Sequence, residues 1–247
     1  KCQMCVCSPP YFGLRSYLDD DDPDKPLEIG TESLDDYIDN LVSVFRRVWN
    51  LLNDDGVLWI VIADSRSGSG GSGGDYGPGG KKEGQLKFRQ QRIPGLAPKN
   101  LVGVPWRLAL TLQDDGWFWR QVVIWDKQLG FFGECTDKEP ESHEYVLMFS
   151  KSKKYYYHPF TQRFNTVWRI RPERASDGHH AKFPEELAAR CITLTSRKGD
   201  IVLDPFLGSG TAAVSAERLG RRWVGVELNR RYAPIIDERT AQMGLFS

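Results

Sequence analysis

The sequence predicts an α/β fold, a doubly wound and mostly parallel sheet with an antiparallel strand at its edge. Three observations predict it. Residues 57–63 form a continuous apolar run, which is typical of a central parallel strand. Residues 34–48 place apolar side chains at helical spacing. A glycine-rich turn at 208–210 separates a short apolar run from a helical stretch.

The bulk composition is that of one globular domain, expected to span residues 1–247. Of the 247 residues, 40% are hydrophobic and 27% charged, which is enough for one substantial core. The 33 basic and 33 acidic residues cancel, so a surface that binds nucleic acid has to come from segregated charge. No apolar run approaches the roughly 18–20 residues that span a membrane. The five cysteines are expected to be reduced thiols inside a cell.

The first half of the chain alternates strand and helix signals. Residues 2–7 are mostly apolar and stop at Pro9-Pro10, which predicts a buried strand. The aspartate-rich residues 19–24 predict an exposed loop. Ser33, with Asp36 three residues later, predicts the start of a helix. Residues 53–56 predict a turn before the apolar run.

Residues 65–95 are expected to form a flexible loop that is rich in Gly and Ser and ends in basic residues. It is either a solvated loop or an arm that reaches phosphates. Residues 104–115 predict a second helix with Pro105 in its first turn. Residues 117–125 and 143–150 predict two strands that pair antiparallel at the sheet edge.

The last third predicts a helix at 183–194, a strand at 201–203, a helix at 211–219 and a strand at 223–226. A final helix is expected at 231–243. Between residues 201 and 227, a strand, a glycine-rich turn and a helix follow one another, which predicts a binding site for an anion or a ribose. Gly208 and Gly210 permit backbone conformations that a Cβ forbids. Glu227 follows Asp204 by 23 residues and is suited to accept hydrogen bonds from ribose hydroxyls.

Two cofactors compete for this turn. Gly208 to Ala213 also match the dinucleotide pattern G-x-G-x-x-A, which alone is weak. Asp204-Pro205 places a carboxylate at the strand end, where it suits a zwitterionic amino-acid ligand better than a pyrophosphate. Nothing else in the chain indicates hydride chemistry. The residues therefore favour S-adenosyl-L-methionine over a nicotinamide cofactor.

With Ser8-Pro9-Pro10-Tyr11 added, the chain resembles the β-class amino-group DNA methyltransferases. These enzymes carry such a loop before the cofactor turn, in a circularly permuted version of the S-adenosylmethionine-dependent methyltransferase fold. Residues 100–107, 143–145, 150–152, 180–184 and 225–229 also resemble the family's motifs, of which 180–184 resemble the segment that packs on the methionine end of the cofactor. The family usually has another strand upstream of the Ser-Pro-Pro-Tyr loop, so either the fold lacks this element or the sequence begins downstream of it.

The resemblance implies transfer of a methyl group to an exocyclic amine of a flipped DNA base. Ser8 in the first position of the loop favours the N4 amine of cytosine over the N6 amine of adenine. A non-catalytic DNA-binding module that has kept the fold is the alternative from another class. The implied catalytic residues are Ser8, Pro9, Pro10 and Tyr11. The implied cofactor residues are Asp204, Pro205, Phe206, Gly208, Ser209, Gly210, Thr211, Glu227, Asn229, His180, Ala181 and Phe183.

Other signals have plainer interpretations. Cys7 ends an apolar strand and is expected to be a core residue rather than a nucleophile. Side chains along a strand point to alternate faces, so Cys2, Cys5 and Cys7 cannot all converge on one metal ion, and no metal is expected. The odd-numbered tryptophans Trp117, Trp119 and Trp125 are expected on one face of a strand.

Residues 127–175 are a candidate target-recognition region. A basic, aromatic stretch around 151–157 is either a solvated edge or a surface that contacts phosphates. Double-stranded DNA is the expected partner, a homodimer is left open and no membrane is expected. The expected location is the cytoplasm, for a prokaryotic or phage protein, or the nucleus of a eukaryote.

Overall fold

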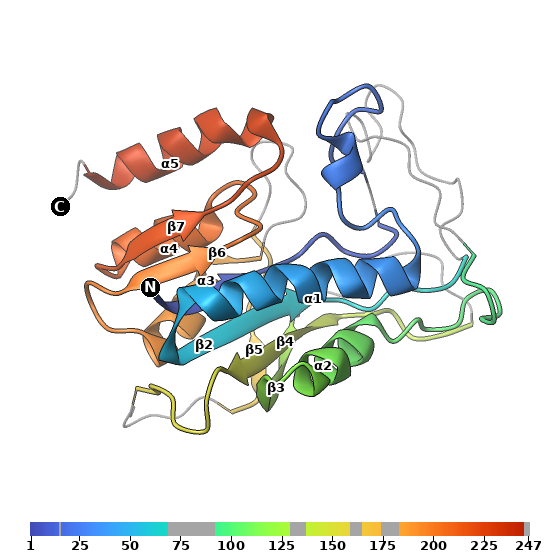
Figure 1. The fold of residues 1–247 in the computed structure, drawn as a ribbon, viewed down its shortest axis with the longest axis horizontal. Helices are drawn as coiled ribbons and strands as arrows, with labels where there is room; N and C mark the ends of the chain where they lie inside the picture. The colour runs from blue at the N-terminus through green and yellow to red at the C-terminus, as the bar shows by residue number, and fades with distance from the viewer. Residues whose placement is uncertain (15, 69–91, 129–136, 159–164, 174–182, 245–247) are drawn as a thin grey trace. The chain divides into compact units, whose positions relative to one another are not determined.

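The computed structural model describes residues 1–14, 16–68, 92–128, 137–158, 165–173 and 183–244 (Figure 1). Most of the loop predicted over 65–95 therefore lies outside the described residues. The chain divides into two compact units. The first comprises residues 1–9, 46–62 and 116–247, and the second comprises 10–45 and 63–115. The first unit holds every strand of the sheet. The single domain over residues 1–247 stays a prediction.

The sheet of the first unit has seven strands in the order β5-β3-β4-β2-β1-β6-β7 (Figure 1). Parallel pairing joins β1 to β2 and β6, β6 to β7, and β3 to β5. The fold class is therefore the predicted mostly parallel α/β sheet. The strands are β1 (Cys2–Cys7), β2 (Leu52–Ile62), β3 (Phe118–Asp126), β4 (His143–Ser150), β5 (Val167–Arg169), β6 (Ile201–Asp204) and β7 (Arg222–Gly225).

The antiparallel strand is β4, which pairs with β2 on one side and with β3 on the other. The sequence predicted this strand but placed it at the edge, whereas it is third in the order. The edge is β5, a strand of three residues that the sequence did not reveal. Its shortness gives no periodicity to detect.

The centre of the sheet is buried along whole strands rather than on alternate residues. All six residues of β1 and the last seven of β2 are buried. Residues 53–56, predicted as a turn, lie within β2 and cause a register shift opposite Cys2 to Met4. The side chain of Gln3, which is 3% exposed, fixes the position of residues 53–56 through hydrogen bonds. Its side chain donates to Asp55 Oδ1 over 3.2 Å and accepts from Asn53 Nδ2 over 2.9 Å.

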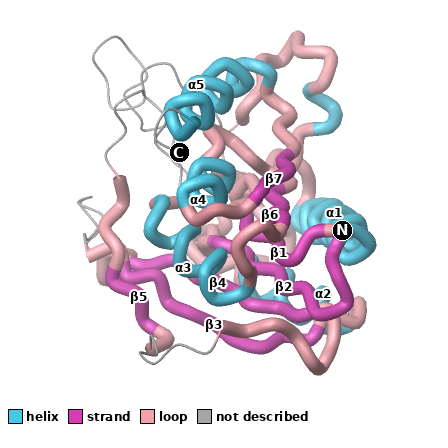
Figure 2. The backbone as a smooth tube through the Cα atoms, turned by 90° about the vertical axis from the view of Figure 1, so that its left-hand side faces the viewer, coloured by secondary structure: helices cyan, strands magenta, loops and turns pink. Residues whose placement is uncertain are grey.

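Two helices, α3 (Glu185–Thr195) and α4 (Thr211–Arg218), cover one face of this sheet (Figure 2). Leu187 and Ile192 of α3 and Ala212 of α4 share a core cluster with Met4 of β1 and Trp59 of β2. The unit ends in η2 (Arg230–Tyr232) and α5 (Ala233–Gly244). No helix among the described residues is long and apolar enough to cross a membrane.

A bulge in β3 overturns the prediction that its tryptophans share a face. The register shifts between Trp119 and Gln121, so one extra residue reverses the alternation of side chains. Trp119 consequently stacks on Phe149, with the ring centroids 6.2 Å apart. Trp125 belongs instead to the cluster beneath α3 and α4. A period-two argument cannot detect an inserted residue.

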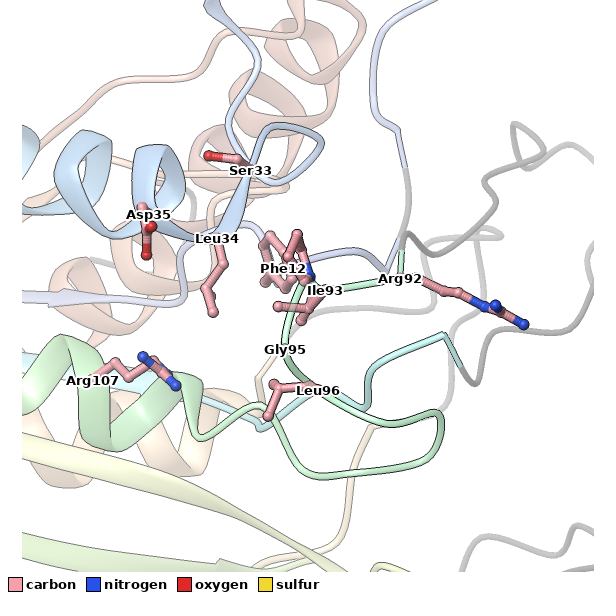
Figure 3. A pocket seen from close by; sticks show the side chains of 10 residues that line it. Phe12, Ser33, Leu34, Asp35, Arg92, Ile93, Gly95, Leu96 and Arg107 are labelled. Atoms are coloured by element: carbon pink, nitrogen blue, oxygen red, sulfur yellow. The ribbon is translucent and has the colours of Figure 1, made fainter.

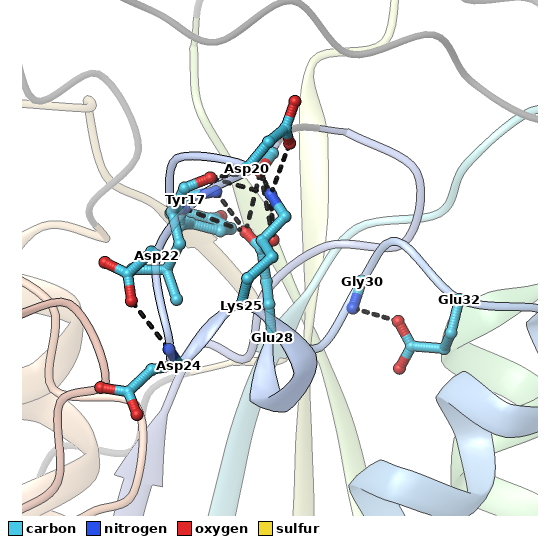
Figure 4. Close-up of polar contacts among 10 residues, drawn as sticks. Tyr17, Asp20, Asp22, Asp24, Lys25, Glu28, Gly30 and Glu32 are labelled. Carbon is cyan, nitrogen blue, oxygen red and sulfur yellow. Dashed lines mark hydrogen bonds and ion pairs between the residues drawn. The ribbon is translucent and has the colours of Figure 1, made fainter.

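The second unit contains η1 (Lys25–Leu27), α2 (Val104–Asp114) and the first part of α1 (Leu34–Leu51). As predicted, the amide of Asp36 donates to Ser33 Oγ over 3.2 Å at the start of α1. The aspartate-rich loop before it is organised by one buried acid, Glu28 (Figure 4). The Glu28 carboxylate accepts from the amide of Tyr17 and pairs with Lys25 Nζ at 2.9 Å.

Candidate functional site

Ser8 follows β1, and Asp204 ends the neighbouring parallel strand β6 of the first unit. Cys5 of β1 is paired with Leu203 of β6, so both chains leave the sheet at the same edge. From this point β1 is followed in sequence by β2 on one side, whereas β6 is followed by β7 on the other. In open α/β sheets, ligands bind outside the carboxyl ends of strands where the order reverses in this way. The topology therefore indicates the position between Ser8 and Asp204.

Asp204 is a buried acid whose carboxyl accepts a hydrogen bond from the amide of Phe206. Its residue is 2% exposed, and burial raises the pKa of its carboxyl to about 7. The amide of Phe206 donates to Oδ1 over 2.9 Å and opposes this shift, while the nearby Glu227 adds to it. A buried carboxyl poised near neutrality favours a cationic ligand, which would stabilise its ionised form.

The glycines of the turn are required by its geometry. Gly210 precedes α4 with φ +84°, a conformation that L side chains rarely adopt, although a Cβ there would make only an ordinary contact of 3.5 Å with Ile236. At Gly225, which ends β7, a Cβ would require the side chain of Leu207 to shift. The nearest Leu207 atom would be 2.6 Å away. The turn thus packs directly on the end of β7, and larger residues at these positions would displace it.

Glu227 connects two segments of the site. One carboxylate oxygen accepts the amide of Gly208 over 2.7 Å, and the other accepts the amide of Asn229 over 2.8 Å. Burial raises the pKa of this carboxyl, against the effect of the amides of Asn229, Gly208 and Leu228. A carboxylate has about four acceptor positions, so these amides leave capacity for a hydroxyl of a ligand.

Thr211 carries a polar group that the described residues do not satisfy. It is the first residue of α4 and is 3% exposed, and its Oγ1 is buried without a hydrogen-bond partner. The first amides of a helix also lack intrahelical partners. A buried orphan hydroxyl beside such amides requires an explanation, and a bound polar ligand supplies one.

Ser209 is held by the last helix. Arg239 of α5 donates through Nη1 to the carbonyl of Ser209 over 2.6 Å, and through Nη2 to Glu185 over 2.9 Å. The start of α3 is thereby tied to the turn. Phe183, predicted to contact a cofactor, is 7% exposed and packs in the core cluster with Leu187. His180 and Ala181 lie outside the described residues.

Pro10 and Tyr11 begin the second unit, where two residues that the sequence did not indicate hold the loop. Tyr37 of α1 is fully buried, and its hydroxyl donates to the carbonyl of Pro10 over 2.8 Å. Ser65 Oγ donates to the carbonyl of Phe12 over 2.6 Å. A hydroxyl 27 or 53 residues distant leaves no local pattern, and the sequence indicated Tyr37 only as a residue of the apolar helix face.

Cys7 is a core residue, as predicted. It is fully buried, and burial raises the pKa of its thiol well above the ordinary value, which disfavours a nucleophilic thiolate. Among the described residues, no group of three or more His, Cys, Asp or Glu side chains is arranged to hold a metal ion.

The basic stretch around 151–157 lies at the end of the sheet opposite to the carboxyl ends of β1 and β6. It follows β4, which runs against the other strands, so it emerges where β2 begins. The amide of Lys151 donates to the carbonyl of Gly56, and that of Tyr156 to the carbonyl of Asp55. By contrast, Lys127 and Arg171 follow β3 and β5 and lie at the same end of the sheet as Ser8 and Asp204.

Comparisons with known proteins agree with this geometry. A family model described as DNA methylase (N6_N4_Mtase) matches residues 2–238. The chain is 42% identical to the Type II methyltransferase M.SmaI of Serratia marcescens, over 95% of this chain and 82% of that protein. It is 38% identical to the Type II methyltransferase M.Cfr9I of Citrobacter freundii, over 95% of this chain and 79% of that protein.

Solved structures share the fold. A putative DNA modification methylase of Thermus thermophilus, complexed with S-adenosyl-L-methionine, aligns with a TM-score of 0.67 and 26% identity. That alignment covers 98% of this chain and 86% of the other. The PvuII DNA methyltransferase (cytosine-N4-specific) aligns with a TM-score of 0.71 and 16% identity, over 98% of this chain and 83% of the other. The family match along nearly the whole sequence confirms the resemblance, and the chain belongs to the N6/N4 DNA methylase family.

Proposed function

We propose that this methylase transfers the methyl group of S-adenosyl-L-methionine to the N4 amine of cytosine in duplex DNA. The observation that carries the proposal is the adjacency of β1 and β6. It brings the start of the Ser-Pro-Pro-Tyr loop and the Asp204 turn to one switch point of the sheet. The relatives named as Type II methyltransferases support the reaction class.

The described residues fit S-adenosyl-L-methionine. The buried carboxyl of Asp204 suits the ammonium of its amino-acid end, and Glu227 suits the ribose hydroxyls. The orphan hydroxyl of Thr211 would gain a partner. When bound, S-adenosyl-L-methionine supplies an electrophilic methyl on its sulfur. The residues proposed to line its site are Phe183, Pro205, Phe206, Gly208, Ser209, Gly210 and Asn229, with His180 and Ala181 retained from the family motif.

The loop acts on the base. An exocyclic amine is a weak nucleophile because its lone pair is delocalised into the ring. The Ser8 hydroxyl and the Pro9 carbonyl are proposed to accept the amine hydrogens and so hold the nitrogen for direct in-line transfer. Tyr11 is proposed to stack on the flipped base. The proton leaves after the nitrogen has become cationic, so no strong general base is required.

The cytosine choice is tested by nucleoside mass spectrometry of DNA incubated with the protein and S-adenosyl-L-methionine. N4-methylcytosine is the expected product. N6-methyladenine as the sole product would replace the cytosine proposal with its adenine alternative. No methylated base, together with intact DNA binding, would favour the non-catalytic module.

The division of roles is tested by two substitutions. Ser8→Ala should lower the rate of transfer while leaving the affinity for S-adenosyl-L-methionine near that of the unmodified protein. Asp204→Ala should weaken that affinity first. Calorimetry and single-turnover kinetics separate the two effects, and equal losses of cofactor affinity in both variants would contradict the assignment.

The DNA surface is proposed at the carboxyl ends of β3 and β5, on the same end of the sheet as Ser8 and Asp204. Arg171→Ala at this end should weaken DNA binding and reduce the salt dependence by about one unit of slope. Lys153→Ala, an exposed cation at the opposite end, is the matched control and should leave both unchanged. A reversed pattern in a binding assay at several salt concentrations would refute this orientation of the DNA.

A further inference from the structure

The second unit contains a cavity of about 540 Å³ that the methyl-transfer site does not include (Figure 3). Its volume falls within the roughly 300–1,000 Å³ of ordinary small-molecule pockets. Phe12, Leu34, Ile93 and Leu96 form apolar walls, and Asp35 and Arg107 lie on the same side of the pocket, on two different helices. These residues come from four segments of the second unit, at residues 12, 33–35, 92–96 and 107.

The apolar walls are preformed. The ring of Phe12 packs on Tyr37 with 5.2 Å between centroids. The segment carrying Ile93 and Leu96 is fastened by the fully buried Ser67. Its Oγ accepts from the amide of Ile93 over 3.2 Å and donates to the carbonyl of Leu96 over 3.3 Å. A ligand entering here would lose little free energy to ordering of the walls.

The polar side presents one cation and one anion. Arg107 Nε donates to the carbonyl of Val102 over 2.9 Å, which fixes the guanidinium. Its terminal nitrogens make no hydrogen bond or ion pair with a described residue. Asp35 likewise has no such partner within the described ranges. An acid in the first turn of a helix interacts favourably with the dipole, but that alone does not require an arginine opposite it.

Apolar walls with a donor and an acceptor on one side match a nucleobase. Guanine fits best because its pairing edge alone carries two adjacent N–H donors beside an acceptor oxygen. A carboxylate accepts from both donors, and a guanidinium donates to O6 and N7. Arg92 lines the mouth and is exposed, with its side chain directed outward (Figure 3), where it suits a phosphate.

We propose that this cavity binds an unpaired guanine nucleotide through Asp35 and Arg107. The proposal rests on the proposed function only for the source of the guanine, a DNA substrate from which a base pair has been opened. The binding chemistry itself depends on the walls and the two charged side chains.

The test is a calorimetric titration of the whole chain with dGMP, dAMP, dCMP and dTMP. Saturating S-adenosyl-L-homocysteine is present to occupy the cofactor site. We expect dGMP to bind about tenfold more tightly than the other three. Asp35→Asn should remove this preference. Asp36→Asn, a change in the neighbouring carboxylate that interacts with Ser33, should retain it.

Equal affinity for the four nucleotides, or a preference for dGMP that survives Asp35→Asn, would overturn the proposal. The same preparations are assayed for methyl transfer to DNA. Transfer without a guanine preference removes only the cavity proposal. A guanine preference without transfer removes only the proposed function and leaves the cavity as a nucleotide site.

Discussion

Replacing Tyr37 by Phe isolates one hydrogen bond that holds the loop carrying Tyr11. The hydroxyl of this fully buried residue donates to the carbonyl of Pro10 over 2.8 Å. Burial raises the pKa of the phenol, so it remains a protonated donor at every working pH. Phenylalanine keeps the ring that packs on Phe12 and removes only the donor.

The size of the effect follows from the environment of the carbonyl. Neither Pro9 nor Pro10 has an amide hydrogen, so these two residues donate no backbone hydrogen bond. Loss of the donor should cost about 1–2 kcal/mol. If this energy holds the loop in its reactive geometry, the rate of transfer should fall about 5–30-fold.

The assay is single-turnover methyl transfer, with cofactor affinity measured by calorimetry and stability by thermal unfolding. Thr195→Val is the matched control, because it also removes one buried hydroxyl. Thr195 Oγ1 accepts from Trp59 Nε1 over 3.1 Å, beneath the sheet. Tyr37→Phe should lower the rate with cofactor affinity retained, whereas Thr195→Val should lower stability alone. A normal rate in Tyr37→Phe, or equal rate losses in both variants, would refute a positioning role.

Three further predictions concern the first unit. Gly225→Ala should destabilise the fold by about 1–3 kcal/mol, because its Cβ meets Leu207. The additional change Leu207→Ala should cost less in this background than alone, and denaturant unfolding measures this coupling. The free energy of unfolding should fall as the pH rises from about 4 to about 7. Folded Asp204, with its pKa raised to about 7, binds a proton that the unfolded chain has already released. Asp204→Asn should flatten this slope, and a slope that persists would assign it to another group. Cys7→Ala should leave the transfer rate within about twofold, since the thiol is a buried core group. A larger loss at unchanged stability would reopen the nucleophile interpretation.

Local patterns were sufficient for most elements because each depends on neighbours in the sequence. The apolar runs at 2–7 and 57–62 became β1 and the paired part of β2. The Ser33 cap began α1, and Pro184 preceded α3. Residues 143–150 became β4. The order of the motifs also indicated the family, which the match over residues 2–238 shows.

Long-range contacts decided the rest. The bulge between Trp119 and Gln121 placed tryptophans on different faces, although strand alternation predicted one face, because the sequence gives no sign of an extra residue in a strand. The direction of β4 moved the basic stretch after it to the far end of the sheet.

The sequence alone determined which residues have the chemistry of a methylase site: the proline-rigid loop, the glycine turn and the acids at strand ends. Only the tertiary structure decided which of them meet. The pairing of β1 with β6 joins segments almost two hundred residues apart, and the hydroxyl of Tyr37 reaches Pro10 from helix α1. Such contacts depend on strand order and packing, which no local pattern of side chains encodes.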